Sequence, residues 1–174
     1  SAFSADVTIW TQGSTSPANP QKALHIKAGE NDIEYPLFAG RGYRADERTS
    51  FDRFILRAWG SRADADLISD PAAQSLLKHT NQNIQAYRPV VVYIDGEYWG
   101  IQNLRERFDK HFLAQFHDSD KDSVDIIESY WGDVDLGTNQ AFLELYNFLD
   151  GNDISVQSNF DYVASKMDID DYID

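Results

Sequence analysis

The sequence contains no cysteine and far too few basic residues to balance its acidic ones. Without cysteine, disulfides, thiolate metal sites and thiol catalysis are all excluded. Lys and Arg number 15 against 29 Asp and Glu, which gives a formal net charge of −14 at pH 7. Such a protein gains little from displacing counterions on nucleic acid, and anionic lipid repels it. Neither nucleic acid nor an anionic membrane surface is therefore expected as a partner.

Long apolar runs are also missing. No stretch approaches the ~20 residues of a membrane-spanning helix, so we expect no membrane insertion. No signal peptide is recognisable, and the opening Ser1-Ala2 is interpreted as a truncation point and not as a natural start. The hydrophobic content of 42%, with 13% aromatic residues, is that of a globular domain. A chain of 174 residues has the usual size of a single domain and needs no metal to fold.

The order of the residues predicts an α+β domain, with a sheet first and helices after it. Apolar and β-branched runs predict strands at 7–10, 22–27, 51–58, 90–94, 97–104 and 124–127. Apolar spacing of three and four predicts helices from 69 to about 80, 109–117, 138–151, from 158 and from 168. The expected capping residues are Ser69 or Asp70, Asp109, Thr138 and Ser158. The last helical pattern is cut off at Asp174, which predicts that the chain is a fragment of a longer protein.

The clearest local signal is a β-hairpin. A run of five apolar residues at 90–94 is followed by Asp95-Gly96, a pair that favours a type I′ turn. Both faces of the first strand are apolar, which predicts a central strand in a covered sheet. The turn sets two cross-strand pairs, Val92 with Trp99 and Tyr93 with Tyr98.

A Gly/Ser loop followed by a lysine is a candidate phosphate site. Gly13 and Ser14 lie between two predicted strands, and Lys22 begins the second of them. Such a loop lets backbone N–H groups approach phosphate, and a nearby lysine adds a point charge. The same residues are also compatible with a plain hairpin loop, because no Walker or dinucleotide pattern is present.

Other groups of residues are weaker candidates for metal, catalytic or ligand-binding sites. Asp118, Asp120 and Asp122 alternate as in a calcium loop, but Ser123 and Ser129 stand where glycine and glutamate are needed, which favours a solvated acidic turn. The four histidines lack zinc-ligand spacing, and no Gly-x-Ser-x-Gly elbow is present. The charged run at 105–107 is compatible with a solvated cluster or with a connector whose backbone binds a flat ligand. Exposed tryptophans would favour a sugar-binding domain.

The hairpin and its flanks resemble the signature of the spore-coat protein H (CotH) kinase-like family. The resemblance spans nearly the whole chain and rests on four segments: 86–109 (AYRPVVVYIDGEYWGIQNLRERFD), Pro20-Gln21-Lys22-Ala23-Leu24, Phe54-Ile55-Leu56-Arg57-Ala58, and Ser69-Asp70 with Leu76-Leu77. It implies an atypical protein-kinase-like N-terminal lobe, with an antiparallel sheet, packed helices and a truncated C-terminal lobe. Within this one domain fragment, residues 1 to about 107 would form the β-rich lobe and 108–174 the start of the helical lobe.

The resemblance also implies a site for ATP with Mg²⁺ in the full-length protein. Lys22 would hold the phosphates, with Gly13 and Ser14 in the loop above them. Leu104, Arg105 and Glu106 would form the lobe connector beside the adenine. The metal-binding and catalytic aspartates of the family lie beyond the matched segments, so no catalytic or metal residue is assigned here.

The function implied is ATP binding within a protein kinase that phosphorylates Ser or Thr of an unspecified protein, the fragment itself being inactive. The resemblance further implies an exported or cell-surface bacterial protein, part of a longer multidomain chain. The alternative is a non-catalytic bacterial surface module of the same fold that binds protein or glycan. Ser16 stands where the family has an arginine, which favours this alternative.

Overall fold

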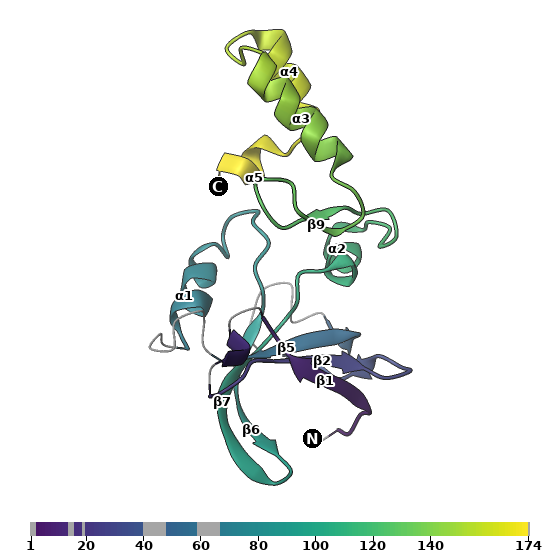
Figure 1. Ribbon diagram of the computed structural model, residues 1–174, viewed down its shortest axis with the longest axis vertical. Coiled ribbons are helices and arrows are strands. Elements are labelled where there is room, and N and C mark those ends of the chain that lie inside the picture. Colours follow the sequence, from purple (N-terminus) through teal and green to yellow (C-terminus); the bar gives the residue numbers. More distant parts are fainter. Residues whose placement is uncertain (1–2, 14–15, 19, 40–47, 59–66, 174) are drawn as a thin grey trace. The chain divides into compact units, whose positions relative to one another are not determined.

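The protein divides into two compact units. The computed structural model describes residues 3–13, 16–18, 20–39, 48–58 and 67–173. The first unit comprises Ser1–His79 and Asn83–Phe108, and the second comprises Thr80–Gln82 and Asp109–Asp174. Strands dominate the first unit and helices the second (Figure 1), as expected for an α+β protein. No helix in the described ranges has the length and apolar character needed to cross a membrane.

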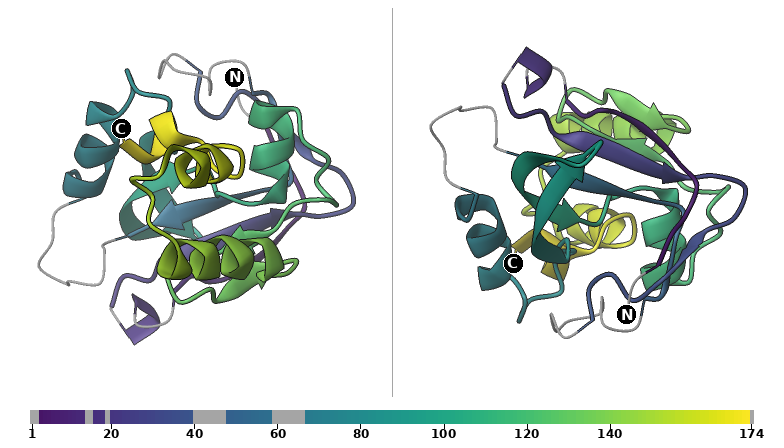
Figure 2. Two further views of the ribbon diagram at one scale, coloured as in Figure 1. Left: turned by 90° about the horizontal axis from the view of Figure 1, so that it is seen from above. Right: turned by 90° about the horizontal axis from the view of Figure 1, so that it is seen from below.

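The first unit is built on a five-stranded antiparallel sheet, seen from two further directions in Figure 2. This confirms the predicted fold class. In spatial order the strands are β1 (Val7–Thr11), β2 (Leu24–Ala28), β5 (Arg53–Arg57), β7 (Glu97–Arg105) and β6 (Tyr87–Ile94). The remaining elements of this unit are the 3-10 helix η1 (Ser16–Ala18), the short paired strands β3 (Ile33–Glu34) and β4 (Ser50–Phe51), and α1 (Ser69–Leu76).

The main hydrophobic core belongs to this sheet and the loops beside it. Phe38 and Phe51 are fully buried and meet edge to face, with ring centroids 5.6 Å apart. The guanidinium of Arg48 lies 4.5 Å from the centroid of the Phe51 ring. The core cluster consists of Leu24, Ile26, Ala28, Ile33, Leu37, Phe38, Phe51, Phe54, Ala86 and Leu104.

The predicted hairpin is confirmed, with two corrections. Asp95 and Gly96 have φ of 51° and 83°, as a type I′ turn requires, and Tyr93 pairs with Tyr98. Val92 pairs with Gly100 rather than with Trp99, because a bulge interrupts the register after Val92. β6 is an edge strand and not a central one, so its apolar character does not reflect burial on both faces.

Three other boundaries differ from the prediction. β2 begins at Leu24, so Lys22 precedes the strand. The strand expected over 51–58 is two strands, β4 and β5, which pair with different neighbours. Helix α1 ends at Leu76 and lacks a side-chain cap, because it already begins at Ser69 and the residue before it, Ile68, has no polar side chain. The predicted caps Ser69 and Asp70 are therefore wrong, and the Asp70 carboxylate is held by two arginines.

The second unit contains α2 (Lys110–His117), the paired strands β8 (Ile126–Ile127) and β9 (Val134–Leu136), α3 (Gln140–Gly151), α4 (Gln157–Ala164) and α5 (Ile169–Ile173). Asp109 caps α2 as predicted, accepting hydrogen bonds from the N–H groups of His111 and Phe112. The predicted caps Thr138 and Ser158 are wrong. The Thr138 N–H binds Asp125 while Asn139 precedes α3, and α4 already begins at Gln157.

Candidate functional site

The candidate phosphate site is the loop between β1 and β2. Gly13 has a φ of 97°, a left-handed conformation that favours glycine. The Lys22 ammonium donates a hydrogen bond of 2.6 Å to the carbonyl oxygen of Pro17, within the same loop. The structure thus brings the lysine to the loop that the sequence singled out. Ser14 lies outside the described residues.

A buried glutamine joins this loop to the centre of the sheet. Gln102 on β7 is fully buried, and its Nε2 donates a hydrogen bond of 2.7 Å to the carbonyl oxygen of Lys22. β7 continues from Gln102 directly into Leu104 and Arg105. Two of the predicted site segments are therefore connected by a single side chain, which sequence spacing did not reveal.

The main chain of the predicted connector is used within the fold. Leu104 and Arg105 pair with β5 on one side and β6 on the other. The Glu106 N–H donates to the carbonyl oxygen of Ala86 at 3.3 Å, and the Glu106 carbonyl accepts from Gln85 Nε2 at 2.8 Å. A role for these three residues beside adenine stays a prediction.

Glu106 has a clear structural role. Its carboxylate is buried, with Oε1 3.5 Å from Arg48 Nη1 and Oε2 accepting the Ala86 N–H at 2.9 Å. Burial raises the pKa of Glu106 above its usual value, against the opposing effects of the Ala86 N–H and the Arg48 charge. The group therefore stabilises the start of β6 from the inside of the unit.

Arg105 faces a second ionic cluster. Its guanidinium is buried and binds the Asp70 carboxylate of α1, which also lies 3.1 Å from Arg57 Nη1 on β5. Burial acts to raise the pKa of Asp70, but the charges of Arg105 and Arg57 outweigh it and lower the pKa. Among the described residues, Nε and Nη2 of Arg105 have no hydrogen-bond partner. The cluster fixes α1 to two neighbouring strands.

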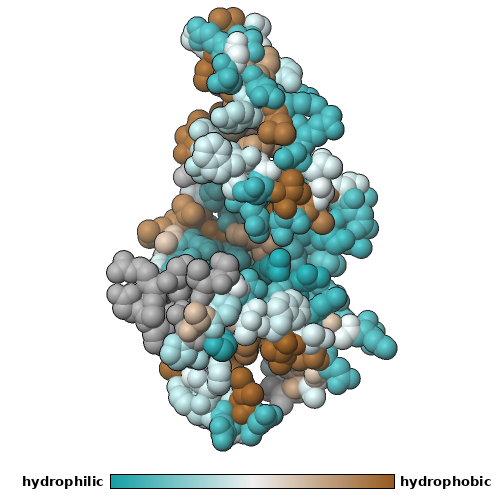
Figure 3. Space-filling model, viewed as in Figure 1, coloured by the Kyte–Doolittle hydropathy of each residue, from teal (hydrophilic) through white to brown (hydrophobic). Residues whose placement is uncertain are grey.

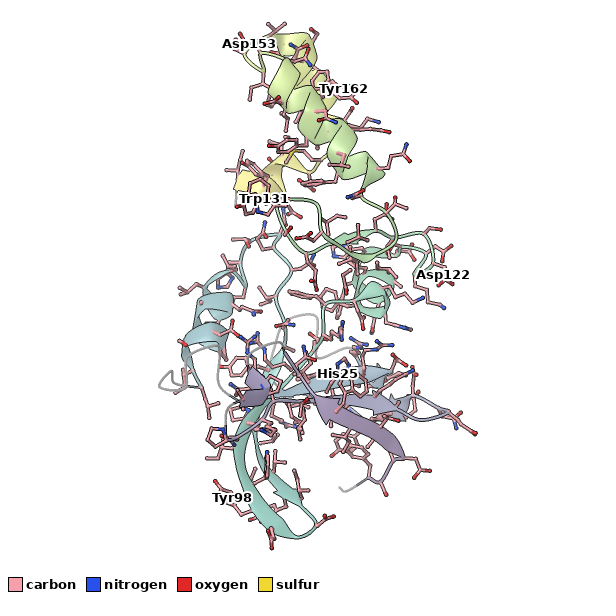
Figure 4. The ribbon with its side chains drawn as sticks, in the orientation of Figure 1. His25, Tyr98, Asp122, Trp131, Asp153 and Tyr162 are labelled. Atoms are coloured by element: carbon pink, nitrogen blue, oxygen red, sulfur yellow. The ribbon has the colours of Figure 1, made fainter. Side chains whose placement is uncertain are left out.

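A buried histidine, which the sequence did not single out, lies beside the candidate loop. His25 on β2 stacks on Trp10 of β1, with ring centroids 4.1 Å apart, and its Nδ1 lies 3.1 Å from both Gln12 Oε1 and Arg107 Nη1. Figure 4 shows His25 among the side chains of the sheet. The pairing of β1 with β2 explains this contact, because Trp10 and His25 are direct cross-strand partners. The register of the two strands could therefore have identified the pair.

The acidic turn of the second unit is stabilised by its own residues. Asp120 accepts hydrogen bonds from the Asp122 N–H at 3.0 Å and from the Ser123 hydroxyl at 3.1 Å. The Asp122 carboxylate accepts hydrogen bonds from Lys110 and Lys121, which lower its pKa. Within the described ranges, no group of three or more His, Asp or Glu side chains is placed to hold a metal ion.

Lys22 and the loop that contains Gly13 fit a phosphate group better than a metal ion. A lysine ammonium at a glycine-containing loop supplies the point charge and the close backbone approach that a phosphate needs. No three of the described His, Asp or Glu side chains are grouped as a metal ion requires, so no residue is assigned to Mg²⁺.

An antiparallel sheet that holds a lysine-bearing loop and is followed by helices defines an α+β protein with a kinase-like N-terminal lobe. The profile of the CotH kinase protein family matches residues 9–174, so the chain belongs to this family. A search of curated proteins found no match, and a search of solved structures found none either.

Proposed function

We propose that this chain forms the ATP-binding part of a CotH-family protein kinase that transfers phosphate to Ser or Thr of a protein. The observation that carries the proposal is the position of Lys22. Its ammonium lies on the β1–β2 loop, and its backbone is anchored to β7 by the buried Gln102. Family membership supports kinase-like chemistry for this arrangement.

Phosphoryl transfer depends mainly on positioning and on neutralising the charge of the phosphates. In the proposal, Lys22 binds the phosphates of ATP, and the loop containing Gly13 and Ser14 lies against them. Mg²⁺, if bound with ATP, would neutralise part of the phosphate charge. Because the described residues hold no group of three or more His, Asp or Glu side chains placed to bind a metal ion, we expect this chain to bind nucleotide without transferring phosphate. A measurable phosphotransfer rate would contradict that expectation.

Thermal unfolding with and without Mg²⁺ and ATP tests the nucleotide site. Ligand at 100 times its Kd stabilises a protein by about 2.7 kcal/mol, which raises the Tm of a domain of this size by several degrees. We expect a shift that requires Mg²⁺ and disappears in Lys22→Ala. Lys27→Ala is the matched control, because Lys27 is an exposed lysine on β2 and should leave the shift intact.

No shift at millimolar ATP, from a well-folded protein, would favour the alternative of a non-catalytic surface module. One observation supports a glycan-binding form of that alternative. Tyr130 and Trp131 are both exposed, with ring centroids 4.3 Å apart, and such aromatic surfaces can stack on sugars. Quenching of tryptophan fluorescence by a neutral quencher, with and without added oligosaccharide, distinguishes the two functions.

The proposal includes an exported or cell-surface bacterial location and a protein phosphoacceptor. Both follow from the family resemblance. Fractionation of cells that express the full-length protein tests the location, because a protein retained in the cytosolic fraction would contradict it.

A further inference from the structure

The β6–β7 hairpin extends beyond the sheet as a two-stranded arm. Among the described residues, β5 pairs with β7 at Asn103, Leu104 and Arg105. Within the same ranges the rest of β7 pairs with β6, and residues 90–101 form a two-stranded arm. Figure 1 shows this arm leaving the body of the sheet, with its turn at the far end.

One face of the arm is apolar and exposed. Val91 pairs with Ile101, and Tyr93 pairs with Tyr98, so strand alternation places all four side chains on the same face. The two tyrosine rings meet at a centroid distance of 5.8 Å. The exposed fractions are 56% for Val91, 63% for Tyr93, 61% for Tyr98 and 47% for Ile101.

The opposite face is covered by the first unit itself. Gly100 is buried beneath the side chain of Gln21, whose Nε2 donates a hydrogen bond of 3.2 Å to the Ile101 carbonyl. Val90 packs against the hydrophobic core, and Trp99 is half-buried. The arm is therefore held in place on one side, while its apolar face stays bare. Figure 3 shows apolar side chains at this end of the molecule next to a hydrophilic tip.

The charge of the arm restricts what can bind there. Residues 90–101 contain Asp95 and Glu97, both exposed, and no lysine or arginine. A second copy of the chain carries the same net charge of −14, and like charges disfavour association. Charge complementarity instead favours a basic partner.

The open edge of β6 indicates how such a partner would bind. Natural proteins protect edge strands with lysines, prolines or a bulge. The bulge here extends β7, and β6 has its proline at Pro89, before the arm begins. In the part of the chain that the structure describes, no strand pairs with the outer edge of β6, so between Val91 and Ile94 its outer main-chain groups can pair with an added strand.

We propose that the arm is a docking site for an extended, basic segment of a partner polypeptide. The segment adds to the edge of β6 as a further strand. Its apolar side chains pack on Tyr93 and Tyr98, and its basic side chains lie near Asp95 and Glu97. The inference does not depend on nucleotide binding or on phosphate transfer.

Binding of synthetic peptides to the 174-residue chain tests the proposal by fluorescence anisotropy. The probe is a labelled peptide of about ten residues, near the upper length of a strand, in which valine or tyrosine alternates with lysine. The control peptide has glutamate at every lysine position. We expect the basic peptide to bind and the acidic peptide not to bind. We also expect affinity to fall as salt rises.

Variants of the arm then locate the site. The double substitution Tyr93→Thr and Tyr98→Thr keeps good strand formers and should weaken binding about tenfold or more. Tyr130→Thr, at an exposed tyrosine of the second unit, is the matched control and should not weaken it. The double substitution Asp95→Asn and Glu97→Gln removes both negative charges, and asparagine tolerates the positive φ of the turn. This variant should bind the basic peptide more weakly, and its affinity should depend less on salt.

Three results would overturn the proposal. One is equal binding of the basic and acidic peptides, or binding of neither at millimolar concentration. Another is binding that the Tyr93→Thr/Tyr98→Thr variant retains while its circular dichroism spectrum stays native. The third is self-association of the unmodified chain that the same variant abolishes, which would make a second copy the occupant of the face.

Discussion

Glu106 shows most clearly how a residue's environment differs from what its neighbours in sequence suggest. Consecutive residues in a strand point to opposite faces, so a charged pair at the end of a strand is expected to have one member in solvent. Arg105 and Glu106 are instead both buried, and each is paired with an opposite charge, Arg105 with Asp70 and Glu106 with Arg48. These partners lie 35 and 58 residues away in the sequence, so spacing could not identify them.

The Glu106→Gln substitution tests this buried ion pair. Removing one partner leaves the buried Arg48 charge without a carboxylate, which we expect to destabilise the protein by about 3 kcal/mol. Urea unfolding at pH 7 gives the change. The control is Arg48→Met with and without Glu106→Gln: the double variant should lose clearly less stability than the sum of the single variants. Additive losses would show that the two groups do not interact.

Asp70 predicts how stability depends on pH. Its pKa in the folded protein lies below the ordinary value of 3.8, so its ionic contribution is fully present above pH 3.8 and is lost as pH falls through the folded pKa. The carboxylate is 39% exposed, so solvent screening limits the cost of Asp70→Asn at pH 7 to about 1 kcal/mol. The protein and the variant should converge in stability as pH falls from 3.8 through the folded pKa of Asp70. A difference in urea midpoint that does not shrink as pH is lowered below 3.8 would contradict this account.

At the scale of elements, turn chemistry was predictable and the surroundings of strands were not. Asp95-Gly96 fixes the hairpin because few residue pairs adopt two successive positive φ values. The bulge after Val92 leaves no comparable mark in the sequence. An apolar strand can be covered by its own protein or left bare for a partner, and its residue types are the same in both cases.

The start of α2 was predictable because a capping side chain directly precedes it. Asp109 accepts hydrogen bonds from two N–H groups of α2, at 3.0 and 3.1 Å. We expect Asp109→Ala to destabilise the protein by about 1 kcal/mol, since two helix donors lose their acceptor. Asp109→Asn retains a good capping oxygen and is the control. Equal losses in the two variants, measured by urea unfolding, would assign the effect to charge and not to capping.

For the whole molecule, the distribution of buried apolar residues between the two units predicts uneven local stability. All ten residues of the main core cluster belong to the first unit. In the second unit, α3 contains no buried residue, and α4 contains only Val163. The sequence alone did not show this contrast, because the apolar spacing of α3 is as regular as that of a buried helix.

Native-state hydrogen exchange measures this contrast directly. Segments with few buried apolar contacts open at a lower free energy than core strands do. We expect the amides of β2, β5 and β7 to exchange slowest, and those of α3 and α4 to exchange roughly tenfold faster or more. Val163→Ala is the internal control, because it should accelerate exchange in α4 and leave β2 unchanged. Uniform protection across both units would instead mean that they unfold as one cooperative body, with the helices as stable as the sheet.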